Sequence, residues 1–188
     1  MQDNRKSQII NTASKLFKER GYSAVTMRDL ATELGIKAAS LYNHINSKQE
    51  ILKEIIISIA EDFTEGIKEI EENNLSASDK LRAIVKLHVI ITSENPYGMA
   101  SLNNDWMHLE DKLEYYLELR NKYEERFRKI LKQGIERNEF MDLDVEVMLF
   151  SVLSTLRSLY LWIPKKENLN IPTLASDLSL VLIEGINK

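Results

Sequence analysis

The sequence predicts an all-α fold with an N-terminal unit of three helices and a larger C-terminal helical domain, about nine helices in all. Three observations support this prediction. Apolar residues recur at helical spacing along almost the whole 188-residue chain. Helix breakers are scarce, with 6 Gly and 3 Pro, and 44% of the residues are hydrophobic, which favours a helical soluble protein. Residues 26–52 contain two short helical segments separated by Gly35.

The first three helices form the predicted N-terminal unit. The first covers about residues 5–20 and ends at Gly21, which suits a left-handed C-cap. The second begins at Thr26, and Asp29 three positions later completes a capping box. A turn that contains Gly35 then leads to a short third helix. Such a pair of short helices is a helix-turn-helix, whose second helix enters the DNA major groove, so the sequence predicts DNA binding.

Six further helices are predicted from capping residues and apolar periodicity. Ser47, with Glu50 three positions later, begins a long helix that extends to about Glu72 and links the two parts of the chain. Asp142 or Asp144 caps an eighth helix that is apolar almost all round. The other helices are expected over about residues 79–93, 102–108 and 110–137, and from about Pro172 onward.

Charge divides the chain in the same way. The formal net charge is −4, but residues 1–50 carry +3 and the remainder carries −7. A basic head on an acidic body is expected where one end of a protein meets phosphate and the other does not. We therefore predict a helix-turn-helix DNA-binding domain over residues 1–47 and a second helical domain over residues 48–188.

The residue inventory disfavours several classes of protein. The chain has no Cys and 3 His, and Asp105 and His108 form an isolated acid–His pair, whereas a di-metal bundle needs two such motifs. No metal, cofactor or catalytic site is therefore predicted. The N-terminal residues lack the apolar run of a signal peptide. The most hydrophobic window, residues 145–163, contains Arg157, which is rare in a membrane span. We expect a cytoplasmic protein without a membrane segment.

The last two helices are predicted to form a homodimer interface. A helix that is apolar on all sides must be covered on all sides, and one chain of this size covers only part of each helix. Residues 144–163 and 172–187 are therefore expected to pair with the same segments of a second copy, as a four-helix bundle around a two-fold axis.

The N-terminal part also resembles the TetR family of transcriptional regulators. The matching positions are Leu16-Phe17, Gly21-Tyr22, Thr26, Leu30-Ala31, Gly35-Ile36, Leu41-Tyr42, His44, Lys48 and Leu52. Two positions depart from the family pattern: Lys37 stands where the recognition helix usually has a Ser or Thr N-cap, and Ile45 replaces the usual aromatic residue. The resemblance implies a homodimeric repressor that binds a palindromic double-stranded DNA operator and holds a small-molecule effector in its C-terminal domain.

Residues 37–44 are expected to lie in the major groove. Lys37 can donate to guanine O6 and N7, Asn43 can pair with adenine or with phosphate, and small apolar side chains can contact thymine methyl groups. Polar groups around them are placed for phosphate contacts, which set the register on DNA. The alternative for Tyr42 and His44 is that they only pack the head. The predicted DNA-binding residues are Thr26, Arg28, Lys37, Ala38, Ala39, Ser40, Tyr42, Asn43, His44 and Lys48.

A ligand pocket is predicted where aromatic residues gather in the second half of the chain, because helical bundles often bind ligands between their helices. Residues 115–134 also resemble family members that sense acyl-coenzyme A thioesters, which implies that class of effector. The alternative is that aromatic residues at this spacing are ordinary core. The predicted ligand-binding residues are Trp106, Tyr116, Arg120, Tyr123, Phe127, Arg157 and Tyr160.

Two other functions remain open from the sequence. One is a dimeric DNA-binding protein without an effector. The other is a helical-bundle enzyme, which requires a catalytic group built around His88 and His108. The partners of Arg120 and Arg157 are also open, because a buried Arg needs an anion from either a protein carboxylate or a ligand.

Overall fold

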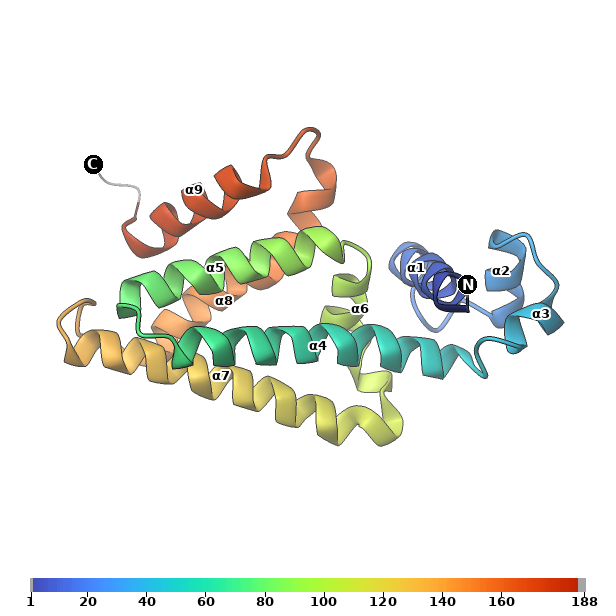
Figure 1. Cartoon of the computed structure of the whole chain (residues 1–188), viewed down its shortest axis with the longest axis horizontal. Coiled ribbons are helices and arrows are strands. Elements are labelled where there is room, and N and C mark those ends of the chain that lie inside the picture. Colours follow the sequence, from blue (N-terminus) through green and yellow to red (C-terminus); the bar gives the residue numbers. More distant parts are fainter. Residues whose placement is uncertain (1, 186–188) are drawn as a thin grey trace. The chain divides into compact units, whose positions relative to one another are not determined.

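The computed structural model describes residues 2–185, and the side chains from Arg5 onward. Within this range the chain forms nine α-helices and no strand (Figure 1), which confirms the predicted all-α class. The helices are α1 (Gln2–Arg20), α2 (Met27–Glu33), α3 (Ala38–Tyr42), α4 (Lys48–Glu72), α5 (Ala77–Glu94), α6 (Gly98–Asn104), α7 (Leu113–Glu136), α8 (Val145–Trp162) and α9 (Ile171–Ile183). Short 3₁₀ turns precede α7 and follow α8.

The helices are grouped in two compact packing units. The first unit comprises the chain up to Ala60 together with Asn95–Tyr116, and the second comprises Glu61–Glu94 together with the chain from Leu117 onward. Helices α4 and α7 each contribute residues to both units. The sequence places the end of the DNA-binding domain at residue 47, which is a functional boundary and not a packing boundary. It stays a prediction.

The first unit is built around a core contributed by its first three helices and the start of α4. Phe17, Leu30, Leu41 and Ile45 are fully or almost fully buried. A capping box fixes the start of α2 as the sequence predicted. The backbone N–H of Asp29 donates to Thr26 Oγ1 (3.1 Å), and the N–H of Thr26 donates to Asp29 Oδ2 (2.8 Å).

Two glycines in the first unit adopt the left-handed backbone that ends its helices. Gly21, after α1, has φ 81°, and Gly35, between α2 and α3, has φ 65°. A residue with a Cβ rarely adopts these conformations. The turn of the helix-turn-helix therefore depends on Gly35, as the sequence indicates.

In the second unit, α5 packs against both α8 and α9 (Figure 1). Its core includes the fully buried side chains of Ile67, Ile84, Phe127 and Leu156. The N-cap of α8 is Asp144 rather than Asp142, because Asp144 Oδ1 accepts from the N–H groups of Glu146 (2.8 Å) and Val147 (3.2 Å).

Candidate functional site

The recognition helix α3 presents one face to the core and the opposite face to solvent. Leu41 and Ile45 point inward, with 0% and 1% of their surface exposed. Lys37, Ala39, Ser40 and Asn43 are exposed, and Tyr42 is 51% exposed. The inward anchors fix which side chains of this short helix face outward.

All ten predicted DNA-binding residues reach the surface of the first unit. Thr26 and Arg28 are exposed like most of α3, while Ala38, His44 and Lys48 are partly exposed. None of the ten is buried. Tyr42 and His44 are therefore accessible to solvent, even if they also pack against the rest of the first unit. Their contacts with DNA stay a prediction.

Lys37 occupies the N-cap position of α3 without capping it through its side chain. Its backbone carbonyl accepts from the N–H groups of Ser40 (2.9 Å) and Leu41 (3.3 Å). Because its side chain makes no capping hydrogen bond and is exposed, the ammonium group stands at the outer face of the helix. Its donation to an acceptor in a DNA groove stays a prediction.

Lys48 is held by the loop that follows α1. Its Nζ donates to the carbonyl of Tyr22 (2.8 Å) and lies 4.3 Å from the centroid of the Tyr22 ring. Partial burial lowers the pKa of the Lys48 ammonium. This side chain therefore ties the first turn of α4 to the loop between α1 and α2, in addition to its predicted phosphate contact.

The predicted ligand-binding residues fall into two groups, one in each packing unit. In the first unit, Trp106 stacks on Tyr116 with ring centroids 6.0 Å apart. In the second unit, Tyr123 and Phe127 are buried and meet edge to face at 6.3 Å, while Tyr160 is partly buried. The predicted residues are thus divided between the two units, and their role in ligand binding stays a prediction.

The two arginines of the predicted pocket share one carboxylate. Arg157 Nη2 donates to Glu124 Oε1 (2.7 Å), and Arg120 Nε lies 3.4 Å from the same oxygen. Arg128 approaches the other oxygen of Glu124 at 3.5 Å and also pairs with Glu146. The anion that pairs with these two arginines, which the sequence did not identify, is therefore a carboxylate of the protein itself.

The sequence did not predict that His88 and Tyr123 form a buried polar pair in the second unit. His88 on α5 is 4% exposed, and its Nε2 lies 2.7 Å from the hydroxyl of Tyr123 on α7. Its ring lies 4.6 Å from that of Phe63 on α4. Burial, with a smaller contribution from the positive charge of Arg157, lowers the pKa of His88 to about 3. Nothing in the sequence links His88 to Tyr123, because they lie 35 residues apart.

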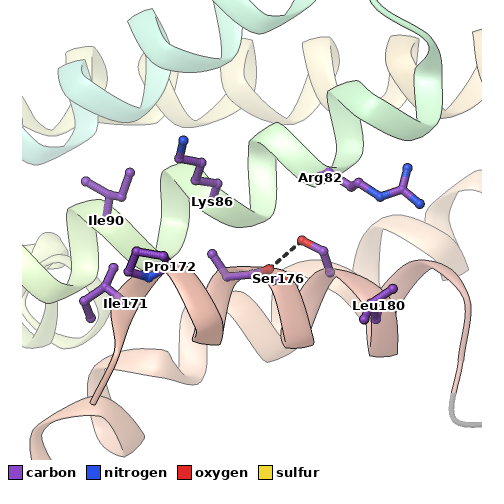
Figure 2. A pocket seen from close by; sticks show the side chains of 9 residues that line it. Arg82, Lys86, Ile90, Ile171, Pro172, Ser176 and Leu180 are labelled. Atoms are coloured by element: carbon purple, nitrogen blue, oxygen red, sulfur yellow. Dashed lines mark hydrogen bonds between the residues drawn. The ribbon is translucent and has the colours of Figure 1, made fainter. Parts of the chain in front are cut away.

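Two grooves open on the second unit within the described residues. One, of about 380 Å³, lies between α5 and α9 (Figure 2). Figure 2 shows Arg82 and Lys86 on its α5 wall and Ile171, Pro172 and Leu180 on its α9 wall. The other, of about 740 Å³, lies between α8 and α9. None of the predicted ligand-binding residues lines either groove.

Among the described residues, no group of three or more His, Asp or Glu side chains is arranged to hold a metal ion. His88 lies in the second unit beside Tyr123, and His108 lies in the first unit beside Tyr22. The catalytic pair that an enzyme would require is therefore not assembled within either unit.

An exposed recognition helix on a three-helix core, followed by a longer helical region, defines a helix-turn-helix DNA-binding protein. Two family descriptions match the chain: "Bacterial regulatory proteins, tetR family" over residues 9–55, and "Tetracyclin repressor-like, C-terminal domain" over residues 74–186. The chain belongs to the TetR family. It is a DNA-binding transcriptional regulator and not an enzyme, in keeping with the curated relatives that it matches.

Three relatives illustrate the match. The HTH-type transcriptional repressor KstR2 of Rhodococcus jostii (strain RHA1) is 26% identical over 185 residues, covering 97% of this chain and 91% of the relative. The crystal structure of PfmR from Thermus thermophilus is 28% identical, with a TM-score of 0.82 over 96% of this chain and 99% of that one. The structure of AibR with isovaleryl coenzyme A and operator DNA is 20% identical, with a TM-score of 0.78 over 95% and 98% of the two chains, and shows the shared fold.

Burial of neutral His88 predicts a specific acid sensitivity. The ordinary pKa of His is 6.5, and the pKa of His88 in the folded protein is about 3. Between these two pH values the unfolded state binds a proton that the folded state does not. The free energy of unfolding should therefore fall as the pH drops through this range. From pH 7 to pH 5 we expect the wild type to lose about 2 kcal/mol more than His88→Gln, measured by urea unfolding at equal protein concentration. Equal losses would contradict the buried neutral state.

Proposed function

We propose that the chain is a ligand-responsive homodimeric repressor. Residues 1–47 form its DNA-binding domain, and residues 48–188 form the domain that dimerises and binds an effector. The observation that carries the proposal is the outward face of α3, where Lys37, Ser40, Tyr42 and Asn43 are exposed while Leu41 is buried. In a dimer, two such helices would enter successive major grooves about 34–36 Å apart on a palindromic operator.

The exposed face of α8 supports the proposed dimer. Apolar side chains stand at its two ends, among them Phe150, which is 72% exposed, and Trp162, which is 43% exposed. The middle of the same face carries small hydroxyl residues. Ser151 and Ser158 each donate to the backbone carbonyl four residues earlier, at 2.8 Å. Small side chains with internally satisfied hydroxyls allow a second helix to approach closely without leaving polar groups unpaired.

The groove between α8 and α9 extends this face. Trp162, Leu178 and Val181 contribute to its apolar lining, and Val181 is 49% exposed. We propose that apolar side chains of the second copy fill it, using residues 144–163 and 172–187. Residues 186 and 187 of the second segment lie outside the described part of the chain.

The proposed effector is a small molecule of the acyl-coenzyme A class. AibR, a relative in fold, is known from a structure with isovaleryl coenzyme A and operator DNA. Helix α4 begins at Lys48, directly after the helix-turn-helix, and continues to Glu72 in the second unit. A shift of this helix would therefore move the proposed DNA-binding domain. The effector acts only to the extent that it binds one state more tightly than the other.

We propose a cytoplasmic location. One described segment, Val145–Lys165, is long and apolar enough to cross a membrane by length and composition. Core helices of soluble proteins have the same properties, and Arg157 within this segment is paired with Glu124. We assign the apolar surface of this segment to the dimer interface.

Removal of the exposed ammonium group at position 37 tests the DNA interface. We expect Lys37→Ala to weaken binding to an operator selected from random DNA about tenfold and to relax the base preference at one position. The melting temperature should stay unchanged, because the side chain makes no capping bond. Lys132→Ala, an equal charge change at an exposed position of α7, serves as the control. Equal weakening by both variants would remove Lys37 from the base contacts.

A charge on the exposed face of α8 tests the dimer. We expect Phe150→Glu to convert a dimer into a monomer of 21.8 kDa in sedimentation experiments, since a buried unpaired carboxylate is strongly unfavourable. Met141→Glu, at an apolar position that is 75% exposed and outside the proposed interface, should remain dimeric. A Phe150→Glu protein that stays dimeric would place the interface elsewhere.

Titration of the protein–operator complex tests the effector. We expect acyl-coenzyme A thioesters, beginning with isovaleryl-coenzyme A, to change the affinity for DNA by a factor of about 5 to 150, measured by fluorescence anisotropy. Free coenzyme A at the same concentration is the control. If no acyl chain length changes the affinity, the protein is better described as a DNA-binding dimer without an effector of this class.

A further inference from the structure

Two neighbouring side chains on α5 carry buried polar atoms without a hydrogen-bond partner among the described residues. These atoms are Nδ1 of His88 and Oγ1 of Thr92. His88 is 4% exposed and Thr92 is 0% exposed. Residues four apart in a helix lie on the same face, one turn from each other. Because an unpaired buried polar group costs stability, two of them side by side require an explanation.

Thr92 differs from two other helical hydroxyl residues in the second unit, Ser93 and Ser179. A helical Ser or Thr commonly donates to the carbonyl four residues earlier. Ser93, the next residue along α5, does so with Val89 (2.6 Å), and buried Ser179 on α9 does so with Ala175 (2.7 Å). The hydroxyl of Thr92 does not form this bond, so it is free to act as a donor toward another group.

The partner of Nε2 determines which hydrogen His88 can offer. Burial raises the pKa of the Tyr123 hydroxyl, so this group keeps its proton. Within the described residues, the only hydrogen bond of the Tyr123 hydroxyl is with His88 Nε2, and we assign the tyrosine as donor, because its proton otherwise has no acceptor. A neutral imidazole carries one N–H. That N–H is then on Nδ1, where it is an unmatched donor.

The charges around this pair favour an uncharged ligand group. His88 is neutral, and the nearby guanidinium of Arg157 already donates to Glu124 (2.7 Å). No unpaired cation among these residues compensates for the burial of a carboxylate, which is costly without one. The chemistry that fits two neutral donors one helical turn apart is a carbonyl oxygen, which has two lone pairs.

We propose that His88 and Thr92 form a polar receptor for an uncharged carbonyl oxygen of the effector, with Tyr123 fixing the histidine tautomer. This inference rests on the proposed function as a ligand-responsive regulator and specifies which chemical group of the effector its site recognises. A thioester or ketone oxygen meets the requirement, whereas a thioether or an alkyl chain does not. His88 and Thr92 are thus specificity-determining residues, and Tyr123 is a positioning residue.

Thr92→Val tests the receptor because valine has the shape of threonine without the hydroxyl. The probes are isovaleryl-coenzyme A and its thioether analogue, in which a methylene replaces the carbonyl, with binding measured by calorimetry. We expect the wild type to prefer the thioester about tenfold, Thr92→Val to lose most of this preference, and Thr92→Ser to retain it. Ser179→Ala is the matched control, since it removes a buried hydroxyl that already has a partner, and should keep the preference.

The stability of the ligand-free protein provides an independent readout. Loss of an unmatched buried hydroxyl should leave the melting temperature of Thr92→Val unchanged or raise it by about 2–4 °C, whereas Ser179→Ala should lower it. A clear decrease for Thr92→Val would show that the hydroxyl has a partner within the folded chain and would overturn the inference. Equal binding of thioester and thioether by the wild type would overturn it as well. Binding of neither compound would instead contradict the acyl-coenzyme A part of the proposed function.

Discussion

The burial of Leu41 and Ile45 is the interaction on which the DNA-binding surface depends. Helix α3 contains five residues, and an isolated helix much shorter than about 12 residues is marginal in water. Its N-cap residue, Lys37, adds no side-chain bond. The helix therefore owes its existence to tertiary packing, and the two buried side chains that provide this packing also determine which residues face the solvent. The same packing thus determines both that α3 forms and which of its side chains are exposed.

The second unit shows two ways in which a helical interior treats polar groups. Glu71 and Glu124 each meet more than one cation, Glu71 through Arg126 and Lys129, so these carboxylates are satisfied inside the protein. His88 and Thr92 are not satisfied in this way. Because full burial makes each unmatched donor unfavourable, this contrast separates groups that support the fold from the two groups that we propose to bind a ligand.

The outer face of α8 is exposed in one chain and would be buried in the proposed dimer. Its central hydroxyls are bonded to its own backbone, so they tolerate both water and a neighbouring helix. The apolar residues that need cover stand at the two ends of the helix, with Val147 and Phe150 at one end and Leu161 and Trp162 at the other. An interface with this pattern is anchored at its ends and closely packed in the middle.

Local signals in the sequence were sufficient for the helices and their ends. Gly21, Gly35 and the Thr26–Asp29 capping box act within a few residues of where they stand, and so the sequence alone determined the helix-turn-helix and the family. Sequence could not decide between Asp142 and Asp144 as the cap of α8, since both are equally suitable cap residues. It also could not find the anion that meets Arg157 or the bond between His88 and Tyr123. Those pairs join residues on different helices, 33 and 35 positions apart, and only the packing of the helices brings such residues within hydrogen-bond distance.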